Sequence, residues 1–148
     1  MMTEISELTL LARKLNKKSD QVNRTLTTLN QKLTKLNVGV EIWLDTPLPT
    51  EEKRIDDKGV CHREAGYLGY SRRLGEWQLT VREVNTDVQP NGDTVQTAPL
   101  RYHSLLKCRR DARLAALVQV PRLLDALKAE SERLLKSIDA AERTAQAL

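Results

Sequence analysis

A seven-residue repeat runs through the first 37 residues and constrains the fold more than any other feature of the sequence. In it an apolar residue followed by asparagine recurs at Leu15-Asn16, Val22-Asn23, Leu29-Asn30 and Leu36-Asn37. Extended toward the N-terminus, its a positions are Ile5, Ala12, Ser19, Leu26 and Leu33, and its d positions are Leu8, Leu15, Val22, Leu29 and Leu36. A strict period of 3.5 residues predicts a helix wound against at least one other helix.

A second repeat of the same period covers residues 117–148. Its a positions are Leu117, Leu124, Ser131, Ile138 and Ala145, and its d positions are Val120, Leu127, Leu134, Ala141 and Leu148. Leu11 at g in the first repeat, with Leu123 at g and Leu135 at e in the second, widen both apolar stripes. Such breadth predicts contact with a third or fourth helix. The asparagines fall at e, where they either bond a neighbour or face water.

The second helix is expected to begin well before its repeat. Pro99 precedes a segment that reads as helical from about Tyr102. Pro121 then falls inside the helical pattern, where it removes one backbone hydrogen bond and crowds the preceding turn. We expect a kink or a short break there.

Between the two repeats the apolar period changes from 3.5 to 2. Residues 38–44, 67–74 and 77–84 alternate as strands do, and Gly75-Glu76 reads as a hairpin connection. The sequence predicts a three-stranded antiparallel meander, with a weak fourth strand at 94–97 and exposed loops at 45–59 and 85–93. The expected covered face carries Val38, Val40, Ile42, Leu44, Leu79 and Val81, with Trp43 on the opposite face.

These elements predict a single α+β domain over residues 1–148. Its expected parts are a helix at 1–37, a meander with long loops at 38–98 and a kinked helix at 99–148. We expect the two helices to pair antiparallel, within one chain or across a dimer, with Ile5 beside Leu148 and Leu26 beside Leu127. In the order of its elements, this layout resembles prefoldin-type chaperone subunits, in which two coiled-coil helices flank β-hairpins.

Charge is unevenly distributed along the chain. Residues 1–37 carry 7 basic and 3 acidic groups, residues 38–99 carry 7 and 11, and residues 100–148 carry 10 and 6. The basic groups of the two ends concentrate in two clusters: Arg13, Lys14, Lys17 and Lys18, and Lys107, Arg109, Arg110 and Arg113. Such clusters can neutralise phosphates, so contact with nucleic acid or another polyanion is an alternative function.

No catalytic, cofactor or metal signature is found in the sequence. Cys61, His62, His103 and Cys108 do not have zinc-ligand spacing, and no segment around Cys61 marks a nucleophile. The paired acidic residues at 51–52 and 56–57 lie in a mixed-charge loop, which does not desolvate a carboxyl group. We therefore expect no cofactor and no metal, and free thiols rather than a disulfide.

The function predicted from these features is non-enzymatic self-assembly. The helical seams make a homo-oligomeric interaction or scaffold protein the first hypothesis, with the chain itself as partner and another protein as a further one. A prefoldin-like chaperone or a nucleic-acid-associated module is the second, and an enzyme with a site on the sheet is the third. Since no apolar run reaches membrane-spanning length and no secretory leader is recognisable, the expected location is cytoplasmic.

Overall fold

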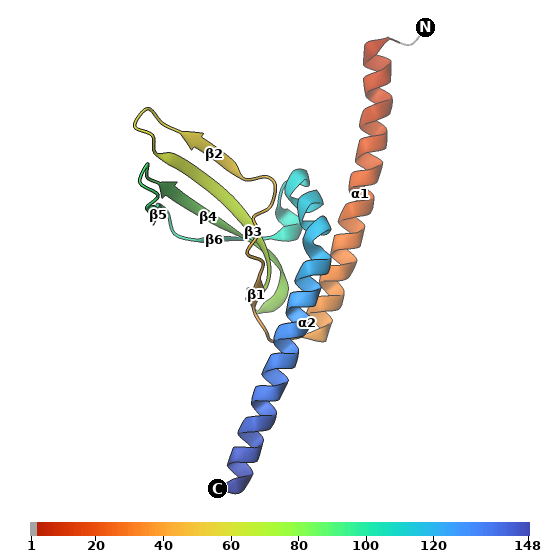
Figure 1. Ribbon diagram of the computed structural model, residues 1–148. Helices are drawn as coiled ribbons and strands as arrows, with labels where there is room; N and C mark the ends of the chain where they lie inside the picture. The colour runs from red at the N-terminus through yellow and green to blue at the C-terminus, as the bar shows by residue number, and fades with distance from the viewer. Residues whose placement is uncertain (1–2) are drawn as a thin grey trace.

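The computed structural model describes residues 3–148 as an α+β fold in which two long helices, one before and one after the strands in the chain, lie on the same side of an antiparallel sheet of six strands (Figure 1). The elements in chain order are α1 (Glu4–Leu36), β1 (Ile42–Trp43), β2 (Glu52–Ile55), β3 (Cys61–Arg73), β4 (Glu76–Val88), β5 (Thr94–Gln96), β6 (Arg101–Ser104), the 3-10 turn η1 (Leu105–Lys107) and α2 (Arg110–Ala147).

The sheet is built on one long hairpin formed by β3 and β4. β1 and β2 both pair with the outer edge of β3, and β5 and β6 both pair with the outer edge of β4. The prediction of a three-stranded meander is therefore wrong in strand number. β2 lies inside the expected loop at 45–59, and the strand expected over residues 38–44 is reduced to Ile42–Trp43.

The hairpin connection lies one residue earlier than the sequence predicts. β3 ends at Arg73 and β4 begins at Glu76, so Leu74 and Gly75 form the turn, with φ of 51° and 82°. Two central residues with positive φ match the right-handed twist of the flanking strands. Glycine adopts this backbone without steric cost, whereas Leu74 does so unfavourably and projects into solvent.

The helix expected from Tyr102 begins eight residues later. Arg101–Ser104 is instead strand β6, with Tyr102 opposite Arg82 of β4. A four-residue segment gains strand hydrogen bonds only where an exposed strand edge is available, and that edge belongs to a distant part of the chain. η1 then leads into α2, which starts at Arg110.

Both ends of α1 are capped by residues outside its apolar stripe. Thr3 Oγ1 accepts a hydrogen bond from the Ser6 backbone N–H at 3.2 Å, and acidic residues in the first turn oppose the positive end of the helix dipole. At the other end Asn37 adopts the left-handed conformation, and its N–H donates to the Leu33 carbonyl oxygen at 3.2 Å. The last asparagine of the repeat is thus a helix cap.

Two further asparagines of the repeat bond neighbouring elements rather than water alone. Asn30 Oδ1 accepts from the backbone N–H of Leu79 in β4 at 2.8 Å, and Asn16 Oδ1 accepts from the Arg110 guanidinium at 3.3 Å. These two asparagines therefore hold α1 against the sheet and against the start of α2.

The hydrophobic core lies between the two helices and one face of the sheet. Its largest fully buried apolar side chains are Tyr70, Leu26, Leu48, Leu68, Leu79, Leu105 and Leu123. The covered face expected for the sheet is found there: Leu44, Leu79 and Val81 are buried, and Val38, Val40 and Ile42 pack against them half-buried. Tyr70 also donates its hydroxyl proton to the Leu33 carbonyl oxygen at 3.2 Å, which fixes α1 to the sheet.

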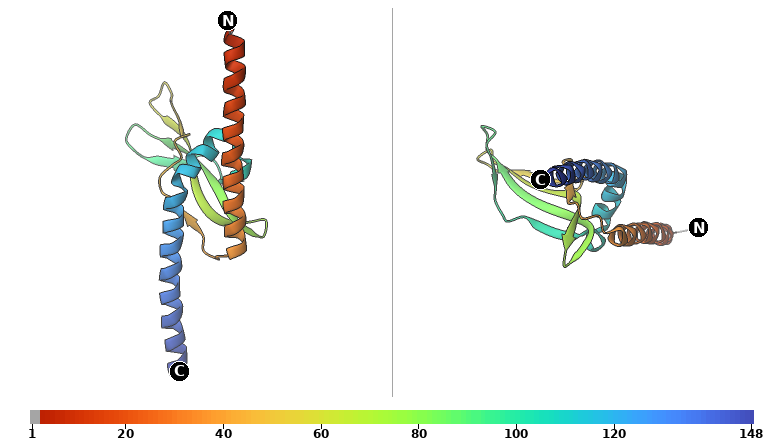
Figure 2. Two further views of the ribbon diagram at one scale, coloured as in Figure 1. Left: turned by 90° about the vertical axis from the view of Figure 1, so that its right-hand side faces the viewer. Right: turned by 90° about the horizontal axis from the view of Figure 1, so that it is seen from below.

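The two helices run in the same direction within the chain, so the expected antiparallel pairing is not formed there. Asn16 lies beside Arg110, and residues 24–32 lie beside residues 117–121, so residue numbers rise together along the pair. Figures 1 and 2 show the termini at opposite ends of the molecule. This layout also departs from the prefoldin-type one, in which the second helix returns along the first. The two helices run in the same direction because β6 and η1 return the chain to the middle of α1 rather than to its end.

Pro121 does not interrupt α2. The helix continues from Arg110 to Ala147 with the proline inside it. Its axis bends in its first half, where Pro121 lies (Figure 2). The expected kink is present and the expected break is not, because the packed side chains on both sides of the proline hold the helix together.

Candidate functional site

The apolar stripes of both helices continue beyond the folded body onto two helical arms. We define the N-terminal arm as residues 4–18 of α1 and the C-terminal arm as residues 128–147 of α2. The exposed large apolar side chains on the two arms are Ile5, Leu8, Leu10, Leu11, Leu15, Leu134, Leu135 and Ile138. These are the predicted seam positions of the arms and their flanking leucines, except Leu10.

The N-terminal stripe is the continuation of a packed stripe. Further along α1 the a positions Ser19, Leu26 and Leu33 are the buried residues of the helix. Likewise Val120, Leu123 and Leu127 are buried in α2, before its arm begins. The seam pattern is therefore used within the chain over the middle of the molecule, except at Leu36, which is 68% exposed, whereas the arms present the same pattern to solvent.

A groove between α1 and α2 joins the two stripes. It is lined by Arg24, Thr25, Thr28, Leu29 and Lys32 from α1 and by Leu117, Val120 and Pro121 from α2. Leu29, Leu117 and Val120 are predicted seam residues that the chain covers in part or in full. The groove lies between the two arms along the helix pair.

The two basic clusters, which are distant in the sequence, lie together in space. The hydrogen bond between Arg110 and Asn16 places the start of α2 against the basic part of α1. Of the eight candidate polyanion contacts, seven are exposed, and Arg113 is half-buried with its guanidinium bonded to the Cys108 carbonyl oxygen. The contact brings the second basic cluster close to the first, although Lys107 and Arg109 also line the cavity beside the sheet.

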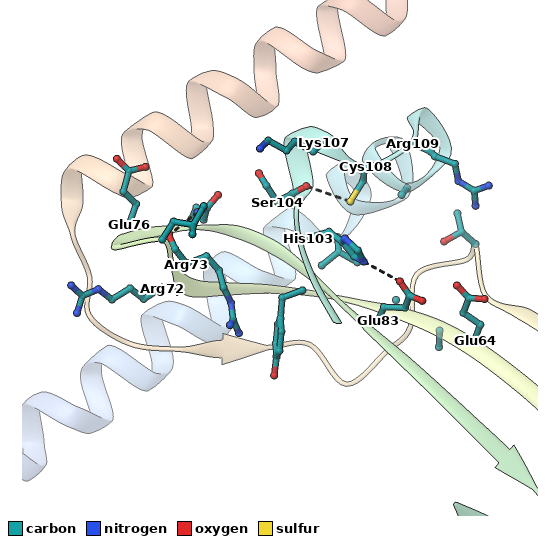
Figure 3. A pocket seen from close by; sticks show the side chains of 18 of the residues that line it. Glu64, Arg72, Arg73, Glu76, Glu83, His103, Ser104, Lys107, Cys108 and Arg109 are labelled. Atoms are coloured by element: carbon teal, nitrogen blue, oxygen red, sulfur yellow. Dashed lines mark hydrogen bonds and ion pairs between the residues drawn. The ribbon is translucent and has the colours of Figure 1, made fainter. Parts of the chain in front are cut away.

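A cavity of about 1150 Å³ beside the sheet brings together acidic side chains and a histidine (Figure 3). His103 Nε2 lies 2.9 Å from Glu83 Oε2, and Glu64 approaches Glu83 from β3. A hydrogen bond with Glu83 and burial raise the pKa of Glu64. The hydrogen bond from His103 lowers the pKa of Glu83. The two neighbouring carboxyl groups therefore differ in acidity, and Glu64 is the weaker acid.

Sequence reasoning missed this cluster because it placed His103 on a helix. As part of β6, His103 instead faces the β4 side chains. The thiol beside it is a poor nucleophile: burial raises the pKa of Cys108, and its Sγ donates to the Ser104 carbonyl oxygen at 3.4 Å. Cys61 and Cys108 are both free thiols.

Trp43 and Tyr102, on the other face of the sheet, pack against each other with their rings tilted. Trp43 lies against Gly69 so closely that any Cβ at position 69 would overlap the indole ring. Its ring centroid is 5.8 Å from that of Tyr102, and the Arg82 guanidinium lies 4.6 Å from the indole centroid. Since these groups are partners of each other, Trp43 has a structural role within the chain.

His62 links the tip of the β2–β3 turn to β4. Its Nε2 lies 2.9 Å from Asp56 Oδ2, and its Nδ1 lies 2.7 Å from Asp87 Oδ1. Asp56 also accepts hydrogen bonds from the backbone N–H groups of Lys58 and Val60, which closes the turn. Hydrogen bonds to Asp56 and then Asp87 raise the pKa of His62, and the bond to His62 lowers the pKa of Asp56.

Replacing His62 with glutamine is expected to destabilise the protein more in mild acid than in base. The folded pKa of His62 exceeds its ordinary value of 6.5, so its contribution is fully present below that pH and declines as pH rises through the raised pKa. The Asp56 contribution persists above its ordinary 3.8 and is lost only as pH falls through its lowered pKa. Urea unfolding of both proteins at about pH 5.5 and about pH 9 measures this difference. If the two proteins differed in free energy of unfolding by as much or more at the higher pH, this prediction would be wrong.

Comparison with protein-family models, curated proteins and solved structures found no match for this chain. Within residues 3–148, neither helix contains an apolar stretch long enough to cross a bilayer. Over the same residues, no three or more His, Cys, Asp and Glu side chains are arranged to hold a metal ion.

Proposed function

We propose that this protein is a non-enzymatic, cytoplasmic interaction or scaffold protein that self-assembles through its helical arms. The observation that carries the proposal is the continuous apolar stripe left exposed on both arms. Exposed apolar surface of this extent and regularity marks an interaction site. Arms of 15 to 20 residues are also marginal as isolated helices in water, so a covering partner stabilises them.

The free energy gained by covering both arms is of the same order as the cost of association or larger. Full burial of a large aliphatic side chain contributes about 1.5–3 kcal/mol, so a half-exposed one gains about 1 kcal/mol when covered. Covering the apolar stripes of two chains therefore contributes about 10–20 kcal/mol of favourable free energy. The entropy lost on association costs about 4–15 kcal/mol. Covering both arms therefore favours association more strongly than covering one arm, which supplies only about half of the gain.

Light scattering at two protein concentrations tests the proposal. We expect a mass at micromolar concentration that is a multiple of the 16.8 kDa chain and that falls on dilution. A strict monomer over the whole concentration range would overturn it.

Polyanion binding by the two neighbouring basic clusters is a second candidate function. Its support is the contact that joins the two basic clusters, since seven exposed cations on adjacent helices can contact several phosphates at once. Recognition of bases by stacking is less favoured, because Trp43 and Tyr102 are occupied with each other.

Changing Arg109 and Arg110 to glutamate together is expected to weaken binding to single-stranded RNA without unfolding the protein. Loss of two phosphate contacts with a single strand reduces the magnitude of the slope of log affinity against log salt by about 1.4. Stability should change by less than about 1 kcal/mol, because exposed charges are screened. The matched control is Lys53→Glu with Arg54→Glu on exposed β2, which makes the same charge change away from the two basic clusters. Equal losses in both proteins would show that net charge alone acts, and unfolding of the first would show that its arginines are structural.

A further inference from the structure

The two arms of one chain cannot cover each other. α1 and α2 run in the same direction and are staggered, with Asn16 level with Arg110. The N-terminal arm therefore extends beyond one end of the shared region and the C-terminal arm beyond the other (Figures 1 and 2). Any partner of either arm must come from another molecule.

We propose that a second copy of this chain supplies both partners, in a two-fold dimer that pairs each N-terminal arm antiparallel with the other copy's C-terminal arm. This inference rests on the proposed self-assembly and specifies its geometry. A two-fold axis perpendicular to the helices reverses the direction of the second copy. Its C-terminal arm then lies beside the first copy's N-terminal arm, and the reciprocal pair forms at the other end.

The apolar layers of the two arms match in one antiparallel register. An antiparallel seam places a positions opposite d positions. The facing layers are Ile5 with Leu148, Leu8 with Ala145, Ala12 with Ala141 and Leu15 with Ile138. Every layer is apolar: Leu8 faces the small Ala145, and the Ala12–Ala141 layer is small on both sides. The register cannot continue through Leu26 and Leu127, because both are buried within their own chain.

The same register places the two-fold axis at the groove between α1 and α2. Leu29 lines the groove together with Val120 and Pro121, so these residues lie at nearly the same level along the helix pair. The arm register sets Leu29 of one copy level with Leu124 of the other, so the two copies are related close to the level of Leu29. The grooves of the two copies therefore face each other midway between the two arm pairs, and the interface is continuous.

Charge favours this exchange over pairing of two N-terminal arms. The N-terminal arm carries four basic groups against two acidic ones, and the C-terminal arm carries four of each sign. Parallel self-pairing of the N-terminal arms would place two arms of net charge +2 next to each other, whereas exchange pairs each of them with an arm of net charge zero. Exchange avoids this repulsion and leaves no apolar arm uncovered.

Disulfide crosslinking between two singly substituted chains tests the register. In a background with Cys61→Ser and Cys108→Ser, chains carrying Ala12→Cys are mixed with chains carrying Ala141→Cys. Both positions are exposed and lie outside the core, so folding is not affected. The control mixes Lys17→Cys with Lys136→Cys, which lie at the same level but on the outer faces of the arms. We expect the 12/141 mixture to crosslink at least roughly tenfold faster than the control, because the paired arms hold the two thiols together.

Each other outcome overturns a distinct claim. Efficient self-dimerisation of Ala12→Cys alone would replace exchange with parallel pairing of N-terminal arms. A 12/141 rate equal to the control, in a protein that scatters light as a dimer, would reject this register while leaving self-assembly intact. A monomeric mass for the same proteins would reject self-assembly itself. With both cysteines in one chain, covalent ladders beyond the dimer would exclude two-fold closure.

Discussion

Truncation of Leu79 to alanine is expected to destabilise the protein by about 2–5 kcal/mol. Leu79 is fully buried in β4, opposite Tyr70 of β3, in the core that both helices cover. Removal of the branched end of Leu79 loses its contacts with these neighbours. It also leaves a cavity, because the surrounding side chains keep the β-hairpin and the helices apart. For a chain of this size the midpoint of thermal unfolding should fall by about 5–15 °C.

Leu74→Ala is the matched control for that experiment. It makes the same chemical change on the same hairpin, but Leu74 is 98% exposed. We expect a change of less than about 0.5 kcal/mol, since no contact is lost. Urea unfolding of the two variants measures both values. Equal effects would show that the β3–β4 hairpin does not present its Leu79 face to the helices.

Leu15→Glu is expected to weaken self-association by about 100-fold while leaving the fold of the chain intact. Leu15 is a seam position of the N-terminal arm and is 52% exposed, so a glutamate there is solvated in the free chain. In the assembled arm the carboxylate would be moved from water into an apolar seam. A desolvation cost of about 1.5 kcal/mol at each of the two substituted sites of the dimer corresponds to roughly a 100-fold loss of affinity.

Leu10→Glu separates the seam from the general effect of a new charge. Leu10 lies on the same arm with a nearly identical exposure of 51%, but it is at an outer f position of the repeat. We expect its dissociation constant to stay within roughly threefold of the natural chain, because exposed positions outside a seam contribute little. Sedimentation or light scattering over a dilution series compares the two. A similar loss for both variants would contradict a seam and indicate diffuse hydrophobic association.

The sequence alone determined the features that depend on local periodicity. The repeats of period 3.5 predicted both long helices, and within them the buried positions Leu26, Leu33 and Leu127. The alternation around residue 43 placed Leu44 on the covered face and Trp43 on the other. These properties follow from which side chains recur on one side of a helix or strand, so they can be read before the chain folds.

Contacts between distant segments decided the rest. β2 and β6 are short and polar, and they become strands because the outer edges of β3 and β4 offer hydrogen bonds to them. The cluster of Glu64, Glu83 and His103 exists only because β6 pairs with β4. The direction of α2 relative to α1 was decided in the same way, by the return of the chain through β6 and η1 to a point beside Asn16. An apolar stripe specifies that a helix must be covered, but a neighbouring helix running in either direction can cover it. Only the tertiary arrangement sets the direction of α2 relative to α1 and leaves the two arms at opposite ends.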